Sequence, residues 1–403
     1  MPFKHNAARR HRIGSMKFKV TNWPSRSGIL ERHAILKKTA DEILARKDEL
    51  GRLLSREEGK TLAEGIGETV RAGQIFEFFA GETLRLAGEV VPSVRPGIGV
   101  EITREPVGVV GIITPWNFPI AIPAWKVAPA LCYGNTVVFK PAELVPGCSW
   151  AIVDILHRAV ASVEHNRKYQ LEMGGKNPFV VLDDADLSVA VEAAVNSAFF
   201  STGQRCTASS RIIVTEGIHD RFVAAMGERI KGLVVDDALK AGTHIGPVVD
   251  QSQLNQDTDY IAIGKKEGAK LAFGGELVSR DTPGFYLQPA LFTEATNDMR
   301  ISREEIFGPV AAVIRVRDYD EALAVANDTP FGLSSGIATT SLKHATHFKR
   351  NAEVGMVMVN LPTAGVDFHV PFGGRKASSY GPREQGKYAA EFYTNVKTAY
   401  TLA

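Results

Sequence analysis

The sequence predicts an α/β protein with two domains, and three observations support this fold class. The chain has 403 residues, more than one hydrophobic core of ordinary size accommodates. Residues 107–113 and 136–139 are short apolar runs rich in β-branched side chains, as expected for central parallel strands covered on both faces. Residues 121–133 lie between these runs and are predicted to form the crossover helix of a βαβ unit.

The other elements follow in order along the chain. Between residues 29 and 86, apolar side chains recur at helical spacing with charged residues between them, which predicts two or three amphipathic helices. After residue 172, strands and helices alternate again and predict a second α/β domain, with segments at 179–182, 186–200, 210–214 and 218–234. Residues 101–104 and 395–400 are predicted strands that stand apart from both domains.

Composition and charge exclude several classes of function. The formal net charge is +2 and no long basic stripe follows residue 20, so the sequence predicts no nucleic-acid partner. The apolar stretch 107–127 contains Pro115, Pro119 and Pro123, which a membrane-spanning helix would not tolerate, so no membrane association is expected. Three scattered cysteines form neither a disulfide framework nor a CxxC pair, which favours a reducing cytoplasm and predicts no metal site.

The first residues of the chain, 1–22, form a basic segment with no acidic side chain before Glu31. Such a segment superficially resembles an organelle transit peptide. Pro2 and Gly14 interrupt any amphipathic helix that could be drawn through it. A basic tail without fixed structure is therefore the favoured interpretation.

Three chemically informative side chains stand near the ends of apolar segments. Cys206 lies among small residues, Glu172 precedes two glycines, and Asn117 lies in a proline-bounded turn after residues 107–113. A nucleophile, a carboxylate base and an oxyanion donor are the parts that acyl transfer through a covalent intermediate requires. A lone cysteine is more often a buried and inert thiol, and Asn117 also fits a helix cap. The three residue types together favour catalysis.

Seven short segments occur in an order that resembles the NAD(P)-dependent aldehyde dehydrogenase superfamily, over residues 23–400. They are PWNFP at 115–119, KPAE at 140–143, LEMGGKNP at 171–178, STGQRCT at 201–207, EIFGP at 305–309, NDTPFGL at 327–333 and PFGG at 371–374. The resemblance implies a Rossmann-type dinucleotide-binding domain from residues 23–91 and 107–172 and an α/β catalytic domain from residues 173–388. Residues 92–106 and 389–403 are then oligomerisation strands, which implies a homodimer or a homotetramer.

The resemblance also implies a mechanism for aldehyde oxidation. Cys206 attacks the carbonyl, while the Asn117 side-chain amide and the Cys206 backbone N–H stabilise the oxyanion. The thiohemiacetal then loses hydride to nicotinamide, and a water activated by Glu172 hydrolyses the thioester that remains. Sulfur suits the first step because it both attacks and leaves well.

Five residues match positions at which the family contacts its cofactor. Lys140 and Glu143 match the pair at the adenine ribose, where a carboxylate accepts from both hydroxyls but repels a 2′-phosphate. NAD is therefore favoured, with NADP as the alternative. Trp116 is implied to lie beside the cofactor, and Glu305 and Phe307 match contacts to the nicotinamide ribose and ring. Residues 305–309 could instead form only a strand end and a turn.

The closest resemblance is to dehydrogenases of 2-oxoglutarate semialdehyde (2,5-dioxopentanoate), on the basis of residues 205–211 and 365–369. Arg205 precedes the nucleophile and could bind a substrate carboxylate with two hydrogen bonds. A solvated or salt-bridged arginine is the equally weighted alternative. Weaker candidates for the same role are Arg85 and Arg211, and His369 is predicted to be a packed loop residue.

The chain departs from the family between its cofactor and base motifs. Only residues 141–171 separate Lys140 from Glu172, where the family normally fits two further strand and helix pairs. A βαβ unit alone takes about thirty residues, so an internal deletion is predicted. The family segment whose helix start receives the cofactor diphosphate has no counterpart, which predicts weak or absent dinucleotide binding. Two alternatives therefore stay open: a catalytically impaired family remnant and a cofactor-independent thiol esterase.

Overall fold

The computed structural model describes residues 18–19, 28–157 and 171–402. Of the predicted basic tail, only β1 (Phe18–Lys19) falls within the described residues, and it pairs antiparallel with β5 (Thr136–Lys140). Three helices follow, α2 (Ile29–Ala45), α3 (Lys47–Glu58) and α4 (Leu62–Glu82), which confirms the predicted helical region. A capping box, in which Thr61 and Glu64 bond each other's backbone N–H, begins α4.

The predicted βαβ unit is confirmed as the centre of a small sheet. Strand β4 (Val109–Ile113) pairs in parallel with β5, and α5 (Ala121–Cys132) connects the two. The sheet order is β1-β5-β4, and within the described residues no other strand pairs with β4. Helix α6 (Pro146–His157) follows β5. One apolar core unites α2 to α6 with these strands.

The larger domain contains a seven-stranded sheet with the order β16-β15-β7-β8-β13-β12-β9, and only β9 runs antiparallel to its neighbour. Its strands are β7 (Pro178–Val181), β8 (Arg211–Thr215), β9 (Lys270–Phe273), β12 (Ala290–Ala295), β13 (Val310–Val316), β15 (Ser334–Ala338) and β16 (Met356–Val359). Its helices are α7 (Leu187–Phe199), α8 (Glu216–Lys231), α9 (Gln251–Lys266), α10 (Arg300–Arg303), α11 (Tyr319–Asn327) and α12 (Leu342–Asn351). Two apolar cores cover its opposite faces.

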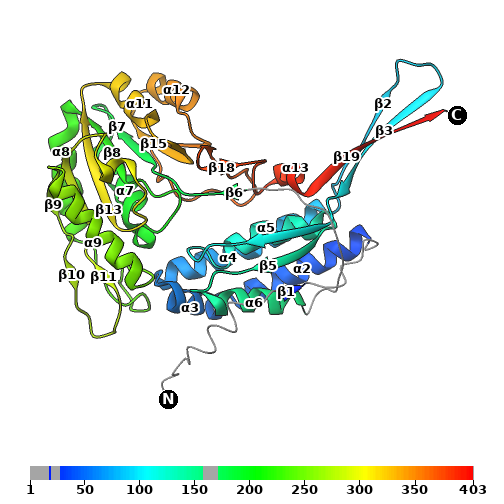
Figure 1. Cartoon of the computed structure of the whole chain (residues 1–403), viewed down its shortest axis with the longest axis horizontal. Helices are drawn as coiled ribbons and strands as arrows, with labels where there is room; N and C mark the ends of the chain where they lie inside the picture. The colour runs from blue at the N-terminus through cyan, green and yellow to red at the C-terminus, as the bar shows by residue number, and fades with distance from the viewer. Residues whose placement is uncertain (1–17, 20–27, 158–170, 403) are drawn as a thin grey trace.

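A separate three-stranded antiparallel sheet projects from the body as an arm (Figure 1). It consists of β2 (Glu89–Pro92), β3 (Ile98–Pro106) and β19 (Thr394–Leu402), in the order β19-β3-β2. The predicted strands at 101–104 and 395–400 are thus confirmed inside β3 and β19. None of the described helices is long and apolar enough to cross a membrane.

Short elements complete the chain and connect the two domains. Strand β6 (Leu171–Glu172) pairs with β18 (Ser379–Tyr380) and not with β4. The strand that carries Glu172 is therefore held by a segment far along the sequence. The others are β10 (Leu277–Val278), β11 (Tyr286–Leu287), β14 (Phe331–Gly332), β17 (Arg375–Lys376), α13 (Ala390–Tyr393) and the 3₁₀ turns at Phe200–Gly203 and Lys387–Ala389.

Candidate active site

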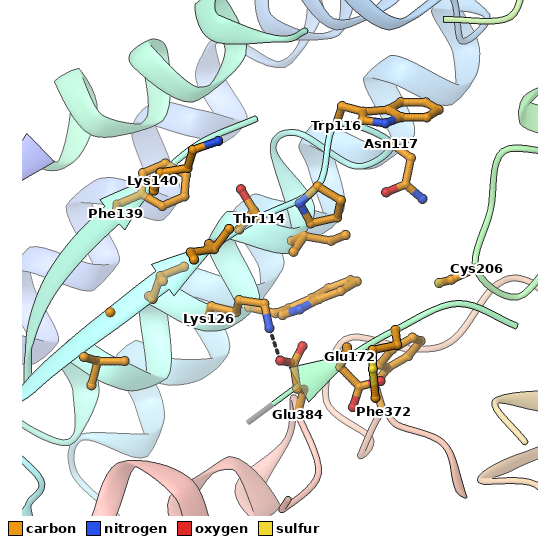
Figure 2. A pocket seen from close by; sticks show the side chains of 18 of the residues that line it. Thr114, Trp116, Asn117, Lys126, Phe139, Lys140, Glu172, Cys206, Phe372 and Glu384 are labelled. Atoms are coloured by element: carbon orange, nitrogen blue, oxygen red, sulfur yellow. Dashed lines mark hydrogen bonds and ion pairs between the residues drawn. The ribbon is translucent and has the colours of Figure 1, made fainter. Parts of the chain in front are cut away.

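A cavity of about 1330 Å³ lies between the β4 side of the small sheet and the larger domain. It is lined by all three predicted catalytic residues, Asn117, Glu172 and Cys206. Figure 2 shows them around one common opening, although each comes from a different part of the chain. The structure therefore brings together the thiol, the carboxyl and the carboxamide that the sequence singled out.

A tight turn after α7 carries Cys206 into the cavity. Ser201 and Thr202 adopt left-handed backbone conformations, with φ of 51° and 55°, which are unusual for residues other than glycine. Gly203 is required next to them because a Cβ at this position would lie 2.3 Å from the carbonyl oxygen of Gly308. This turn reverses the chain between α7 and β8 and presents the thiol of Cys206.

The thiol of Cys206 is protonated in its surroundings. Burial, followed by the nearby carboxyls of Glu172 and Glu305, raises the pKa of Cys206 to about 12. A base must therefore take its proton before it can attack. The other two thiols, Cys132 and Cys148, are buried outside the cavity, and burial raises the pKa of each.

Glu172 is the predicted base, and it lines the same cavity as the thiol. Its Oε2 accepts a 2.6 Å hydrogen bond from the Oγ of Ser379, its partner across the β6–β18 pair. Burial, reinforced by Glu384, raises the pKa of Glu172 to about 8. A carboxyl with this pKa exchanges protons readily near neutral pH, as general acid–base catalysis requires.

Asn117 lies at the end of β4, in the turn that leads into α5. Its side chain is buried, and Nδ2 donates a 3.1 Å hydrogen bond to the backbone carbonyl of Gln204. A carboxamide has two N–H donors, so this bond leaves one for an oxyanion. The same bond ties the turn to the loop that carries Cys206.

Four of the five predicted cofactor residues also line the cavity: Trp116, Lys140, Glu305 and Phe307. The rings of Trp116 and Phe307 meet edge to face with centroids 5.7 Å apart. The carboxylate of Glu305 accepts a 2.8 Å bond from the N–H of Gly175, and burial raises the pKa of Glu305. This part of the cavity lining therefore contains two aromatic rings in contact and a buried carboxyl.

Glu143, the fifth predicted cofactor residue, lies outside the cavity lining. Its carboxylate is exposed and forms a 3.6 Å ion pair with Lys140. The cavity extends along β4 past Gly111, where no further described strand covers the edge. The start of α5 contributes Ile122 to the same lining, and the lack of a diphosphate-binding helix start stays a prediction.

The structure does not bring the predicted substrate-binding arginine into the cavity. Arg205 turns back along α7, where its guanidinium donates to the backbone and side-chain oxygens of Asn196. The weaker candidates also lie elsewhere: Arg85 pairs with Glu82, and Arg211 is buried beneath α11. From the sequence alone, Arg205 could point into the cavity or away from it, and in the structure it points back to the oxygens of Asn196 near the end of α7.

The cavity also contains groups that the sequence did not single out. Lys126 of α5 forms an ion pair with Glu384, and both line the cavity (Figure 2). Trp125 stacks on Phe372 with ring centroids 5.3 Å apart. Lys126 could have been suspected because it shares α5 with the Asn117 turn, whereas nothing local marks Glu384. His369 packs against Phe368, and no group of described residues could hold a metal ion.

Comparison with known proteins defines the class. The sequence model of the aldehyde dehydrogenase family matches residues 10–163 and 158–399. The chain is 43% identical to the alpha-ketoglutaric semialdehyde dehydrogenase of Bacillus subtilis (strain 168), over 94% of this chain and 87% of the relative. It is 36% identical to the 2,5-dioxopentanoate dehydrogenase of Saccharolobus solfataricus, over 95% and 89%.

Solved structures agree with the sequence comparison. The betaine aldehyde dehydrogenase of Staphylococcus aureus in complex with NAD+ superimposes with a TM-score of 0.90 at 31% identity, covering 94% of this chain and 83% of that chain. The protein therefore belongs to the aldehyde dehydrogenase family, and the fold class predicted from the sequence is confirmed.

Proposed function

We propose that this protein oxidises 2-oxoglutarate semialdehyde to the carboxylate through a thioester on Cys206, with NAD as hydride acceptor. The observation that carries the proposal is the convergence of Asn117, Glu172 and Cys206 on one cavity. Relatives that are 43%, 39% and 36% identical are named for this aldehyde, under either of its two names, which supports the choice of substrate.

The first step is a proton transfer that conserves charge. A thiolate of Cys206 next to an ionised Glu172 would place two negative charges in one partly buried site, and burial together with the nearby Glu172 raises the pKa of Cys206 to about 12. Transfer of the thiol proton to Glu172 leaves a single charge, on sulfur. The thiolate then adds to the aldehyde carbon, and the second N–H of Asn117 stabilises the resulting oxyanion.

The cofactor residues fit the nicotinamide half of a dinucleotide best. Trp116 and Phe307 offer aromatic faces, and Glu305 offers a carboxylate to ribose hydroxyls. When bound, NAD supplies the acceptor for the hydride. The exposed carboxylate of Glu143 supports NAD over NADP because it would repel a 2′-phosphate.

Hydrolysis of the thioester completes the reaction. Once Glu172 has returned its proton to solvent, it can remove a proton from a water molecule that attacks the acyl carbon. The C–S bond then breaks and Cys206 regains a proton. The same carboxyl thus acts in both halves of the reaction, which is compatible with its pKa of about 8.

The substrate carboxylate needs a cation, and Lys126 is the cation that we propose. Lys126 and Lys140 are the cations among the described residues that line the cavity, and Lys126 raises the acidity of Glu172. Arg205 remains a second candidate whose guanidinium would first have to leave Asn196. In the double variant Lys126→Met with Glu384→Gln, KM should rise for the acidic aldehyde more than for an uncharged one.

Turnover with NAD and 2-oxoglutarate semialdehyde tests the proposal. We expect NADH to form only when both compounds are present, and Cys206→Ala to abolish its formation. Val94→Ala, in the exposed loop of the arm, is the control that should retain it. A wild-type protein that binds NAD saturably but forms no NADH from any aldehyde would contradict the proposal.

A thiol esterase is the second candidate, and a specific observation favours it. The thiol, the base and the carboxamide need no dinucleotide to cleave an activated ester, and the β4 edge that borders the cavity is unpaired among the described residues. Ester cleavage that depends on Cys206, without any response to NAD, would select this reading.

We further propose a cytoplasmic homodimer or homotetramer that assembles through the β2, β3 and β19 arm. The arm projects away from the body (Figure 1) and exposes apolar side chains such as Val396 and Tyr400. Light scattering on the wild type and on a variant truncated before β19 tests this assembly, because a monomeric wild type would contradict it.

A further inference from the structure

The end of α3, the turn after it and the first two turns of α4 carry four charged residues that lie outside the cavity lining: Glu58, Lys60, Glu64 and Glu68. Three of them are buried, with 1% of Glu58, 2% of Lys60 and 4% of Glu68 exposed to solvent. Buried charges are costly unless they are paired and hydrogen-bonded. Their contacts therefore show what they hold in place.

Lys60 holds the backbone of the oxyanion donor. Its Nζ donates a 2.9 Å hydrogen bond to the carbonyl oxygen of Asn117 and another of 2.9 Å to Oε2 of Glu68. The same ammonium lies 3.7 Å from the ring centroid of Phe118. Burial alone would lower the pKa of Lys60, but Glu58 and Glu68 outweigh this effect and raise it, so the ammonium stays charged.

Glu68 holds the other end of the same turn. Its Oε1 accepts hydrogen bonds of 2.9 Å and 3.0 Å from the backbone N–H groups of Ile120 and Ala121, at the start of α5. An acidic side chain in this position caps the helix and complements its dipole. Lys60 and Glu68 together therefore fix both sides of the Asn117 turn.

Glu64 links the same helix to the loop that carries the nucleophile. Its Oε1 accepts bonds of 2.8 Å and 2.9 Å from the N–H and the hydroxyl of Ser201, the first residue of the left-handed turn before Cys206. Its Oε2 completes the capping box with Thr61. One helix end thus contacts the oxyanion-donor turn and the nucleophile loop.

The need for such a clamp follows from the small sheet. Asn117 follows β4, and among the described strands only β5 pairs with β4. A strand held on one edge constrains the turn after it less than a central strand does. The contacts from α4 supply the missing restraint from the opposite side.

We propose that Lys60 and Glu68 are positioning residues that aim the Asn117 carboxamide at the acyl oxygen on Cys206, and that Glu64 fixes the nucleophile loop relative to it. This inference rests on the proposed function. It makes the start of α4 part of the catalytic apparatus, although none of the three residues lines the cavity.

The step to measure is single-turnover acetylation by 4-nitrophenyl acetate without cofactor. The Cys206 sulfur forms a bond to the acetyl carbon, the thiol proton passes to Glu172, and 4-nitrophenolate leaves. Removal of an oxyanion donor typically slows such a step about 100-fold or more. We expect Lys60→Met to slow acetylation about 10- to 100-fold because it displaces Asn117 without deleting it.

Alkylation of Cys206 by iodoacetamide is the matched reaction, since no oxyanion forms in it. In Lys60→Met, iodoacetamide should alkylate Cys206 at a rate within about twofold of the wild-type rate. The double variant Lys60→Met with Glu68→Gln removes both buried charges and should recover thermal stability, but not acetylation. Lys37→Met removes an exposed ion pair to Glu77 at the far end of α4 and should leave both rates unchanged.

Three outcomes test the positioning role of Lys60 and Glu68. Equal acetylation rates in wild type and Lys60→Met would overturn the positioning role, and so would a double variant that recovers acetylation together with stability. If the wild type is not acetylated at all, the proposed function fails first. Amide hydrogen exchange across residues 115–122 then decides the positioning role: faster exchange in Lys60→Met supports it, and unchanged exchange overturns it.

Discussion

The two sheets of this protein differ in how completely they are built. The seven-stranded sheet has an apolar core on each face, and its exposed edge β9 begins with the charged Lys270. The three-stranded sheet ends at β4. Residues 109–113 of this strand carry no charge, and among the described strands only β5 pairs with it. The thiol belongs to the more complete half and Glu172 to the short strand β6, which pairs with β18, while the cofactor motifs after β4 and β5 belong to the less complete half. We therefore expect the protein to catalyse reactions that need only the thiol more efficiently than reactions that also need a dinucleotide.

The largest expected effect concerns hydrolysis of the thioester on Cys206, in which Glu172 is the proposed base. Glu172→Gln should slow hydrolysis of the acetyl thioester by about 10²- to 10⁴-fold, because glutamine cannot accept a proton from water. In the wild type, hydrolysis should rise with pH and level off above about 8, since burial raises the pKa of Glu172 to about 8 and only the ionised form is a base. Release of acetate from the isolated acyl-enzyme measures this profile.

The control for this variant is Glu192→Gln, which removes an exposed carboxylate that pairs with Arg229 on the outer side of α7. It should retain the wild-type rate and pH profile. A Glu172→Gln protein that still shows the inflection near pH 8 would assign that pKa to another group.

The second prediction tests the half that contains β4 and β5. NAD should bind less than about tenfold more tightly than nicotinamide mononucleotide, which corresponds to less than about 1.4 kcal/mol from the adenosine and its phosphate. The physical reason is the predicted lack of the helix start that would receive the diphosphate. Quenching of Trp116 fluorescence, with Trp116→Phe as the blank, measures both affinities. A gain of about a hundredfold would show that the diphosphate is bound well, and the contrast between the two halves would disappear.

Local sequence patterns were enough to predict most elements and to single out the three residues that the structure brings to one cavity. Asn117, Glu172 and Cys206 each follow an apolar or glycine-rich signal within a few residues, so a short segment identifies them. The direction of Arg205 was not predictable, because it depends on hydrogen bonds to the oxygens of Asn196 on the preceding helix.

The long-range contacts around the site could not be predicted from the sequence either. Lys60 reaches the carbonyl oxygen of Asn117, and Lys126 reaches Glu384, across separations of 57 and 258 residues. No periodicity or motif encodes such pairs. They arise because the tertiary fold buries charges, and each buried charge must then find a partner.

The third prediction concerns the stability that the buried Glu58 contributes at the contact between the halves. Burial raises the pKa of Glu58 to about 8 from its usual value of about 4.5, against the opposing influence of Lys60. The folded protein therefore binds this proton more tightly than the unfolded chain does. The contribution of Glu58 to the free energy of unfolding is fully present below about pH 4.5 and is lost as the pH rises to about 8.

Urea unfolding of Glu58→Gln and wild type at pH 5 and pH 8 measures the effect. Between these values the wild type should lose roughly 1–3 kcal/mol more of its free energy of unfolding than the variant. Comparison of the two proteins cancels other groups that titrate in the same range, such as Glu172 and Asp257. Parallel pH curves would mean that Glu58 is ionised in both states.

The smallest effect on folding is expected at the edge of β4, and it sharpens the contrast between the sheets most directly. Ile113, the last residue of β4, is 74% exposed. The edge strand β9 of the larger sheet instead begins with a lysine, Lys270. Ile113→Lys should change the free energy of unfolding by less than about 0.5 kcal/mol, because the side chain is exposed. It should nevertheless reduce concentration-dependent light scattering, since a charged edge strand resists pairing with a second copy. The neighbouring Ile112 is only 3% exposed, so Ile112→Lys should unfold the small sheet instead. Equal scattering by Ile113→Lys and the wild type would show that the unpaired edge of β4 is already protected in solution.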